Sequence, residues 1–294
     1  MKLPRPLSVL LLTLCLMPGL CSCAGSDPAR ELARARERLA QVGSMTCEVV
    51  MDTRMSVQGT PVSMETTCLA ECVSDPLTLK MDLSTDIIAP GIDAGGLDGL
   101  DYTVYAAQNG DRFTMYTQVP GGWVKEELDG PGELEQYDPL SSMDTYLSSF
   151  AGVTQAGSEQ INGVKAARYD CVVGSDAVDG IIGASGVYSQ LAPLGISEER
   201  ARQALSGLGE LPYSVWIDAE SSLPLRCEID MSGIMGALVE KTLGAAGEDF
   251  SGVRLDSLII TMTMGGFDTI SSIDIPAGAL DAMDITGMGF PLFR

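Results

Sequence analysis

The chain has 294 residues, and its 18 Lys and Arg stand against 40 Asp and Glu, so its formal charge is −22. Such an acidic chain repels phosphate, which argues against a nucleic-acid partner. It contains no histidine, so the commonest general base and metal ligand is absent, as is every Ser-His or Cys-His nucleophile pair.

The first 26 residues read as an export signal followed by a short tether. Lys2 and Arg5 precede an apolar run, Leu7 to Leu16, which is too short to span a bilayer. In Leu20-Cys21-Ser22-Cys23, a Leu lies three residues before Cys23 and a Ser directly before it, as in a bacterial lipobox. We therefore expect a lipoprotein signal peptide over 1–22, lipidation of Cys23 and a tether over 23–27. An ordinary secretory signal with incidental cysteines is the alternative.

A helix is predicted after the tether, with Asp27 as its cap, Pro28 in its first turn and Gly43 at its end. From Ser44 the apolar period becomes two, which indicates strands. A two-residue turn at Gly59-Thr60 predicts a hairpin in which Met51 faces Cys68 and Cys47 faces Cys72, with the apolar residues on one face. Leu77 to Leu83 continue this face on a third strand.

The second half of the chain alternates between strands and helical stretches. Asn109-Gly110 predicts a hairpin with Val104 opposite Met115 and Ala106 opposite Phe113. Residues 134–150 are expected to be mainly helical, and helical insertions are expected near 175–210 and 232–250. Further strands are expected over 164–173, 213–218, 223–230 and 256–264. One α+β domain over 28–294 accounts for this order, with a single antiparallel sheet covered on its apolar face by helices.

These elements, in their order, resemble the LolA and LolB superfamily of bacterial lipoprotein carriers, with the mycobacterial lipid-binding lipoproteins and Gram-positive lipoproteins. The features concerned are the first helix and long hairpin, Asn109-Gly110-Asp111 leading to Gly122-Trp123, Val215-Trp216-Ile217-Asp218 with Leu223-Pro224-Leu225, and Phe267 to Ile275-Pro276 with Ala279 to Ala282. The resemblance implies a curved half-barrel sheet whose concave face is closed by helices. Several members of the superfamily carry acyl chains on that face.

Methionine is abundant, at 15 residues, and its flexible thioether suits an apolar guest of variable shape. The candidate ligand-binding row comprises Val49, Met51, Met55, Met64, Met81, Met262 and Met264. The structural alternative is that the helices pack directly onto this row. The leading hypothesis is a non-enzymatic lipoprotein, anchored at the extracytoplasmic face of the cell membrane, that binds a lipid or lipid-linked molecule. A cell-envelope protein-interaction or sensing module with a filled core is the alternative.

The cysteines of the mature domain are Cys47, Cys68, Cys72, Cys171 and Cys227, an odd number. The expected register places Cys47 directly opposite Cys72, where a cross-strand disulfide fits in an oxidising compartment. In a reducing one the two thiols would remain small core residues. No CxxC spacing supports a zinc site, and no metal, cofactor or catalytic residue is expected.

Overall fold

The computed structural model describes residues 27–91, 99–110, 112–128, 138–184, 197, 199, 202–203, 209–246 and 252–287. The predicted signal peptide and Cys23 lie outside these residues. In chain order the elements are α1 (Pro28–Leu39), β1 (Ser44–Val57), β2 (Thr60–Ser74), β3 (Leu77–Ile88), β4 (Leu100–Asn109), β5 (Arg112–Val119), β6 (Gly122–Leu128), α3 (Pro139–Ser148), β7 (Phe150–Ile161), β8 (Val164–Val173), α4 (Ser175–Ala184), β9 (Leu211–Asp218), β10 (Pro224–Asp230), α7 (Ser232–Ala246), β11 (Val253–Gly265), α8 (Ala277–Leu280) and β12 (Met283–Asp284).

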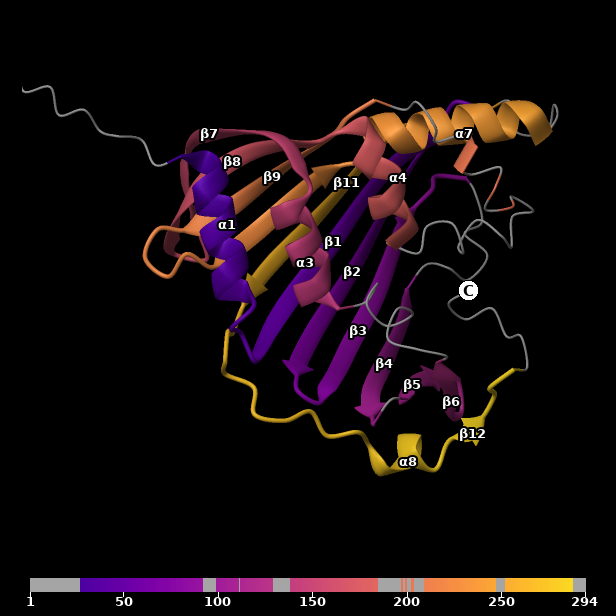
Figure 1. The fold of residues 1–294 in the computed structure, drawn as a ribbon. Helices are drawn as coiled ribbons and strands as arrows, with labels where there is room; N and C mark the ends of the chain where they lie inside the picture. Colours follow the sequence, from indigo (N-terminus) through magenta and orange to yellow (C-terminus); the bar gives the residue numbers. More distant parts are fainter. Residues whose placement is uncertain are drawn as a thin grey trace, which may run out of the picture.

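All the strands belong to one 12-stranded sheet, in the order β12-β6-β5-β4-β3-β2-β1-β11-β10-β9-β8-β7. The pairs are antiparallel except for the short β12, which runs parallel to β6. The sheet is curved and its order is linear, so it does not close into a barrel. Helices α1, α3 and α4 lie against its hollow side (Figure 1). The predicted α+β half-barrel with helices on the concave face is confirmed.

The register of the first hairpin differs from the predicted one by two residues. The turn is Gln58-Gly59, with both residues at positive φ, 51° and 82°, as a two-residue type I′ turn requires. Met51 therefore faces Thr66, and Val49 faces Cys68. Because the side-chain period of a strand is two, a shift of two residues keeps every side chain on its expected face.

The second hairpin shows the same kind of error. Asn109 pairs with Arg112, so the turn lies one residue later than Asn109-Gly110. Val104 faces Thr117 rather than Met115, and Ala106 faces Met115 rather than Phe113. The face is again the expected one, since the register has moved by two residues.

Leu225, Cys227 and Ile229 alternate along β10 as residues of one face would. An irregularity in the strand nevertheless separates Leu225 from the other two. The pairing of β10 with β9 shifts between Pro224 and Arg226. Leu225 consequently packs with Trp216 in a separate small cluster, whereas Cys227 and Ile229 lie in the main core. A bulge of this kind re-aims one side chain without ending the strand.

The main core lies between the hollow side of the sheet and the helices. Leu32 and Ala35 of α1, Met143 and Leu147 of α3 and Ile182 of α4 are at most 1% exposed. They join Met45, Cys47, Ala70, Cys72, Leu79 and Val104 of the sheet in one cluster. The spacing of Leu32, Ala35 and Leu39 explains why α1 packs by one side, since three- and four-residue steps share a helix face.

We expect Leu79→Ala to destabilise the protein by about 2–5 kcal/mol, because Leu79 is fully buried under the helices. Leu69→Ala is the matched control, since Leu69 is 51% exposed on the neighbouring strand β2 and points to the other face. It should change the free energy of unfolding by about 0.5 kcal/mol or less. Urea unfolding followed by tryptophan fluorescence measures both, and equal losses would contradict this assignment of faces.

Candidate functional site

The seven residues of the predicted ligand-binding row all lie on the hollow side of the sheet, here called the inner face. Val49 pairs with Met262, and Cys47 pairs with Met264, across β1 and β11. Ala70 pairs with Met81 across β2 and β3, while Met64 pairs with Thr53 across β2 and β1. Directly paired residues of adjacent strands share a face, so the structure brings the row together.

Burial divides this row into two parts. Met81, Met262 and Met264 are 6%, 5% and 2% exposed and belong to the packed core with the helices. Val49, Met51, Met55 and Met64 are only half-buried. The packed part is filled by side chains of α1, α3, α4 and α7, as the structural alternative expected, whereas the second part remains accessible.

The accessible part also includes apolar residues that the predicted row omits. Ile260 pairs with Met51, Leu258 with Thr53 and Val62 with Met55, and all three apolar residues are half-buried. The alternation of apolar residues along β11 predicted the correct face of the strand, but it did not indicate how deeply each side chain is buried. The residues concerned are Leu258, Ile260, Met262 and Met264. We call Val49, Met51, Met55, Met64, Leu258 and Ile260 the methionine surface.

Three hydroxyl groups lie on the inner face beside the methionine surface. Thr53 is 3% exposed, and its hydroxyl oxygen has no hydrogen-bond partner among the described residues. The hydroxyls of Thr66 and Thr85 bond to each other at 3.3 Å across β2 and β3. A buried hydroxyl without a partner is energetically unfavourable.

Two polar contacts hold α3 over the packed part of the inner face. Asp138 is buried and caps the helix by accepting from the amides of Leu140 at 3.0 Å and Ser141 at 3.3 Å, and it also accepts from the Cys72 thiol at 3.7 Å. The Tyr213 hydroxyl donates to the carbonyl oxygen of Tyr146 at 2.7 Å. These contacts join α3 to β2 and β9.

Cys47, Cys68, Cys72, Cys171 and Cys227 are all free thiols in the structure. Cys47 faces Ala70, and Cys72 faces Met45, so the direct opposition on which the predicted Cys47–Cys72 disulfide depended is wrong. Burial raises the pKa of Cys47 and Cys171 to about 12 and that of Cys68 to about 11. It also raises the pKa of Cys72 and Cys227. All five are therefore protonated at neutral pH.

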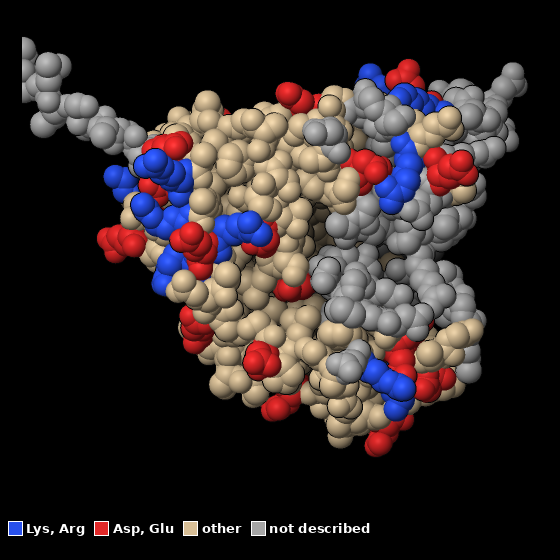
Figure 2. Space-filling model, viewed as in Figure 1, with Lys and Arg blue, Asp and Glu red and all other residues tan. Residues whose placement is uncertain are grey.

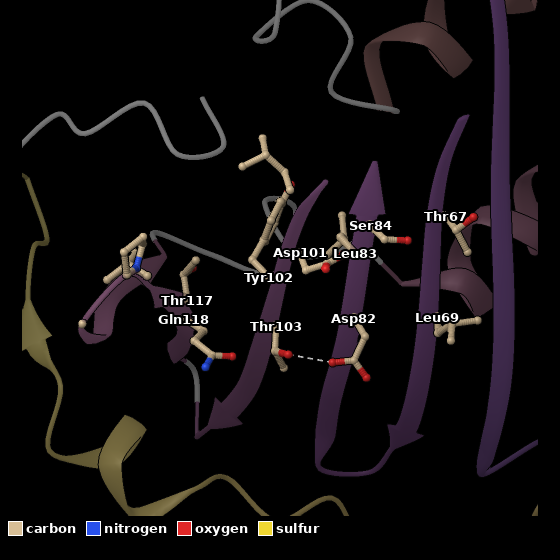
Figure 3. A pocket seen from close by; sticks show the side chains of 14 residues that line it. Thr67, Leu69, Asp82, Leu83, Ser84, Asp101, Tyr102, Thr103, Thr117 and Gln118 are labelled. Carbon is tan, nitrogen blue, oxygen red and sulfur yellow. Dashed lines mark hydrogen bonds between the residues drawn. The ribbon is translucent and has the colours of Figure 1, made fainter. Parts of the chain in front are cut away.

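An open hollow of about 1100 Å³ lies over β2 to β5 (Figure 3). Its lining includes Leu69, Asp82 and Gln118 of the outer face together with Leu83 and Tyr102 of the inner face. The Thr103 hydroxyl donates to Asp82 at 2.7 Å, and the Lys80 ammonium lies 2.7 Å from the same carboxylate. These contacts lower the pKa of Asp82 against the effect of burial. No sequence pattern predicted this hollow, because its outward-facing polar residues follow the ordinary alternation of strands.

Within the described part of the chain, no group of three or more Cys, Asp and Glu side chains is arranged to hold a metal ion. No helix in the same part is both long and apolar enough to cross a membrane.

The sequence matches no protein-family model and no curated protein. The chain is similar to the crystal structure of lipoprotein LppX from Mycobacterium tuberculosis, with 16% identity and a TM-score of 0.44 over 85% of this chain and 100% of that one. It is similar to LprF from Mycobacterium bovis, with 15% identity and a TM-score of 0.47 over 86% of this chain and 97% of that one. A LolA superfamily protein from Nitrosomonas europaea aligns with 9% identity and a TM-score of 0.23, over 85% of this chain and 94% of that one.

These solved structures come from the groups of proteins that the sequence resembles. At these identities and TM-scores the likeness assigns no ligand to the present chain.

We expect the native protein to react slowly with iodoacetamide, and Cys68 to react first. Cys68 is half-buried on the inner face, whereas the other four thiols are buried. With a pKa of about 11, its thiolate fraction at pH 8 is roughly two hundredfold lower than that of a free cysteine, and it rises about tenfold per pH unit up to pH 11. Peptide mapping after timed alkylation measures the order. Earlier labelling of Cys47 or Cys72 would contradict the packing of the inner face.

Proposed function

We propose that this chain is a membrane-tethered extracytoplasmic lipoprotein that binds a hydrophobic ligand, a lipid or lipid-linked molecule, on the methionine surface. The observation that carries the proposal is the uneven burial of the inner face. Strands β1 and β2 are covered by helices around Cys47 and Ala70, whereas Met51, Met55 and Met64, further from that end of the same two strands, are only half-buried. Contiguous apolar residues left accessible beside a packed core are typical of binding surfaces.

The chemistry of the side chains on the methionine surface supports the proposal. Methionine side chains are unbranched and adapt to a flexible chain without a fixed shape of their own. Affinity would come from apolar burial of about 0.8 kcal/mol per methylene, partly offset by the cost of association. Burial of about ten methylenes contributes about 8 kcal/mol against an association cost of at least about 4 kcal/mol, so a long acyl chain is favoured over a short one.

The proposed anchor rests on the sequence. Cys23 follows Leu20 and Ser22 in the lipobox arrangement, after a charged start and a short apolar run. Acyl chains on Cys23 hold the domain at the membrane face. The ligand-binding surface and the source of its lipid would then share one membrane.

We expect Met51→Trp and Met64→Trp to lower lipid retention by about tenfold or more, because an indole ring fills the accessible part of the inner face. Neither change should unfold the protein, since both sites are half-buried. Native mass spectrometry of residues 24–294, with extraction of whatever is bound, measures retention. Val164→Trp is the matched control, because Val164 is an exposed apolar residue of β8 outside both the methionine surface and the hollow.

Two results would contradict the ligand-binding proposal. One is unchanged retention in the Met51 and Met64 variants. The other is an apo mass that stays unchanged when the wild-type domain is incubated with membrane lipids. The second result would favour the alternative function, an envelope interaction module with a filled core.

We expect Cys23→Ser to remove the acyl mass from the full chain and to move the protein from the membrane to the soluble fraction. Cys21→Ser is the matched control, because Pro18 occupies the place where a lipobox anchored at Cys21 would need a Leu. Intact mass and flotation of the membranes measure both effects. Equal loss of acylation in the two variants would contradict the choice of Cys23.

A further inference from the structure

The exposed side of α1 carries a row of arginines on an otherwise acidic molecule. Over Asp27–Leu39, four arginines stand against Asp27, Glu31 and Glu37, a net charge of +1 in a chain of formal charge −22. Arg30, Arg34 and Arg38 follow one another at four-residue intervals and lie on one side of the helix. The buried residues Leu32, Ala35 and Leu39 occupy the other side. Blue side chains gather over α1 at the left of Figure 2.

The contacts of these arginines leave their guanidinium groups open to a stronger partner. The side chain of Arg30 is 84% exposed and lies 3.7 Å from Asp27, and that of Arg34 is 58% exposed and lies 3.0 Å from Glu31. Arg38 donates to two neutral oxygens, those of the Gln41 side chain at 2.9 Å and the Ser221 carbonyl at 3.3 Å. Exposed ion pairs contribute little, so a phosphate group can replace them.

Arg36 has a different role. It makes two hydrogen bonds to Asp144 of α3, Nε to Oδ1 at 2.6 Å and Nη2 to Oδ2 at 2.9 Å. This bidentate pair fixes α1 against α3 on the sheet. The arginine row is therefore presented on a helix with a fixed orientation rather than on a mobile segment.

The position of α1 in the chain brings the row close to the proposed anchor. Four residues, 24–27, separate Cys23 from Pro28, so even a fully extended tether spans about 18 Å or less. The start of α1 is thus held near the headgroups, where the field of anionic lipids falls off over a Debye length of about 8 Å. The acidic remainder of the molecule is repelled by the same field.

We infer that α1 is the membrane-facing surface of the protein, and that Arg30, Arg34 and Arg38 contact the phosphates of anionic lipids. This inference rests on the anchor part of the proposed function and not on the ligand. The lipid bilayer is the occupant, because guanidinium groups bind phosphate oxygens bidentately. Contact of α1 with the bilayer also orients the sheet relative to the membrane, since α1 is joined to α3.

The test places a headgroup-sensitive fluorophore at Ala33→Cys, an exposed position of α1, in full-length lipidated protein carrying Cys68→Ala. The protein is reconstituted in vesicles of phosphatidylcholine alone or with phosphatidylglycerol, each containing a headgroup-attached quencher. With phosphatidylglycerol, quenching at residue 33 should rise about threefold and fall again with added salt. A label at Gln118→Cys, on β5 away from α1 (Figure 1), should change little.

The combined variant Arg30→Gln, Arg34→Gln and Arg38→Gln should lose the response to phosphatidylglycerol while remaining anchored. Arg54→Gln with Arg112→Gln is the matched control, because these side chains are 67% and 74% exposed outside α1. Urea midpoints of both sets establish that they fold. The inference would be overturned if the α1 variant kept the response of quenching to phosphatidylglycerol, or if quenching at residue 33 did not depend on phosphatidylglycerol.

A full chain without acyl mass would overturn the anchor and this inference with it. Failure of lipid retention by residues 24–294 would leave this inference standing and overturn only the ligand.

Discussion

The structure depends on the one-sided apolar character of a very long sheet. Along β1 and β2 every second residue is apolar, sulfur-bearing or Thr, and the sheet directs these residues to a single side. Because a sheet of this width cannot leave such a face in water, helices must cover it. The chain supplies α1 before the sheet, and α3, α4 and α7 as interruptions of it. Curvature lets α1, α3 and α4 lie within the hollow, while α7 lies along its rim against β11 (Figure 1).

The helices cover this face unevenly, and the difference follows the strands. Near the start of β1, Met45 and Cys47 lie in the packed core, whereas Met51 and Met55, further along the same strand and on the same face, are half-buried. The types of residue on the inner face do not change along β1. What changes is the overlying layer, which α1 and α3 supply at one end. The proposed binding surface therefore lies where cover is incomplete rather than where residue type changes.

The faces and most elements could be predicted because the period-two pattern survives any even register shift. Turn type was harder, since Gln58-Gly59 and Gly59-Thr60 are both plausible two-residue turns and only the positive φ of Gln58 separates them. The strand β7 was missed, although Asn162-Gly163, with φ of 51° and 82°, is a strong hairpin signal. The bulge at Leu225 and the depth of each methionine depend on tertiary packing, which no local pattern contains.

Methionine content alone does not identify a binding surface in this protein. Met45 and Met143 are 0% exposed and Met115 is 5% exposed, and all three fill the core as other apolar residues would. The hydroxyl of Thr53 differs from these residues, because it is buried beside Met51 and Met55 without a hydrogen-bond partner in the described part of the chain. A packed core removes such groups or pairs them, as Thr66 and Thr85 are paired. The two properties, incomplete cover and a buried hydroxyl, lie side by side but not at one residue, because Met51 and Met55 are half-buried whereas Thr53 is fully buried.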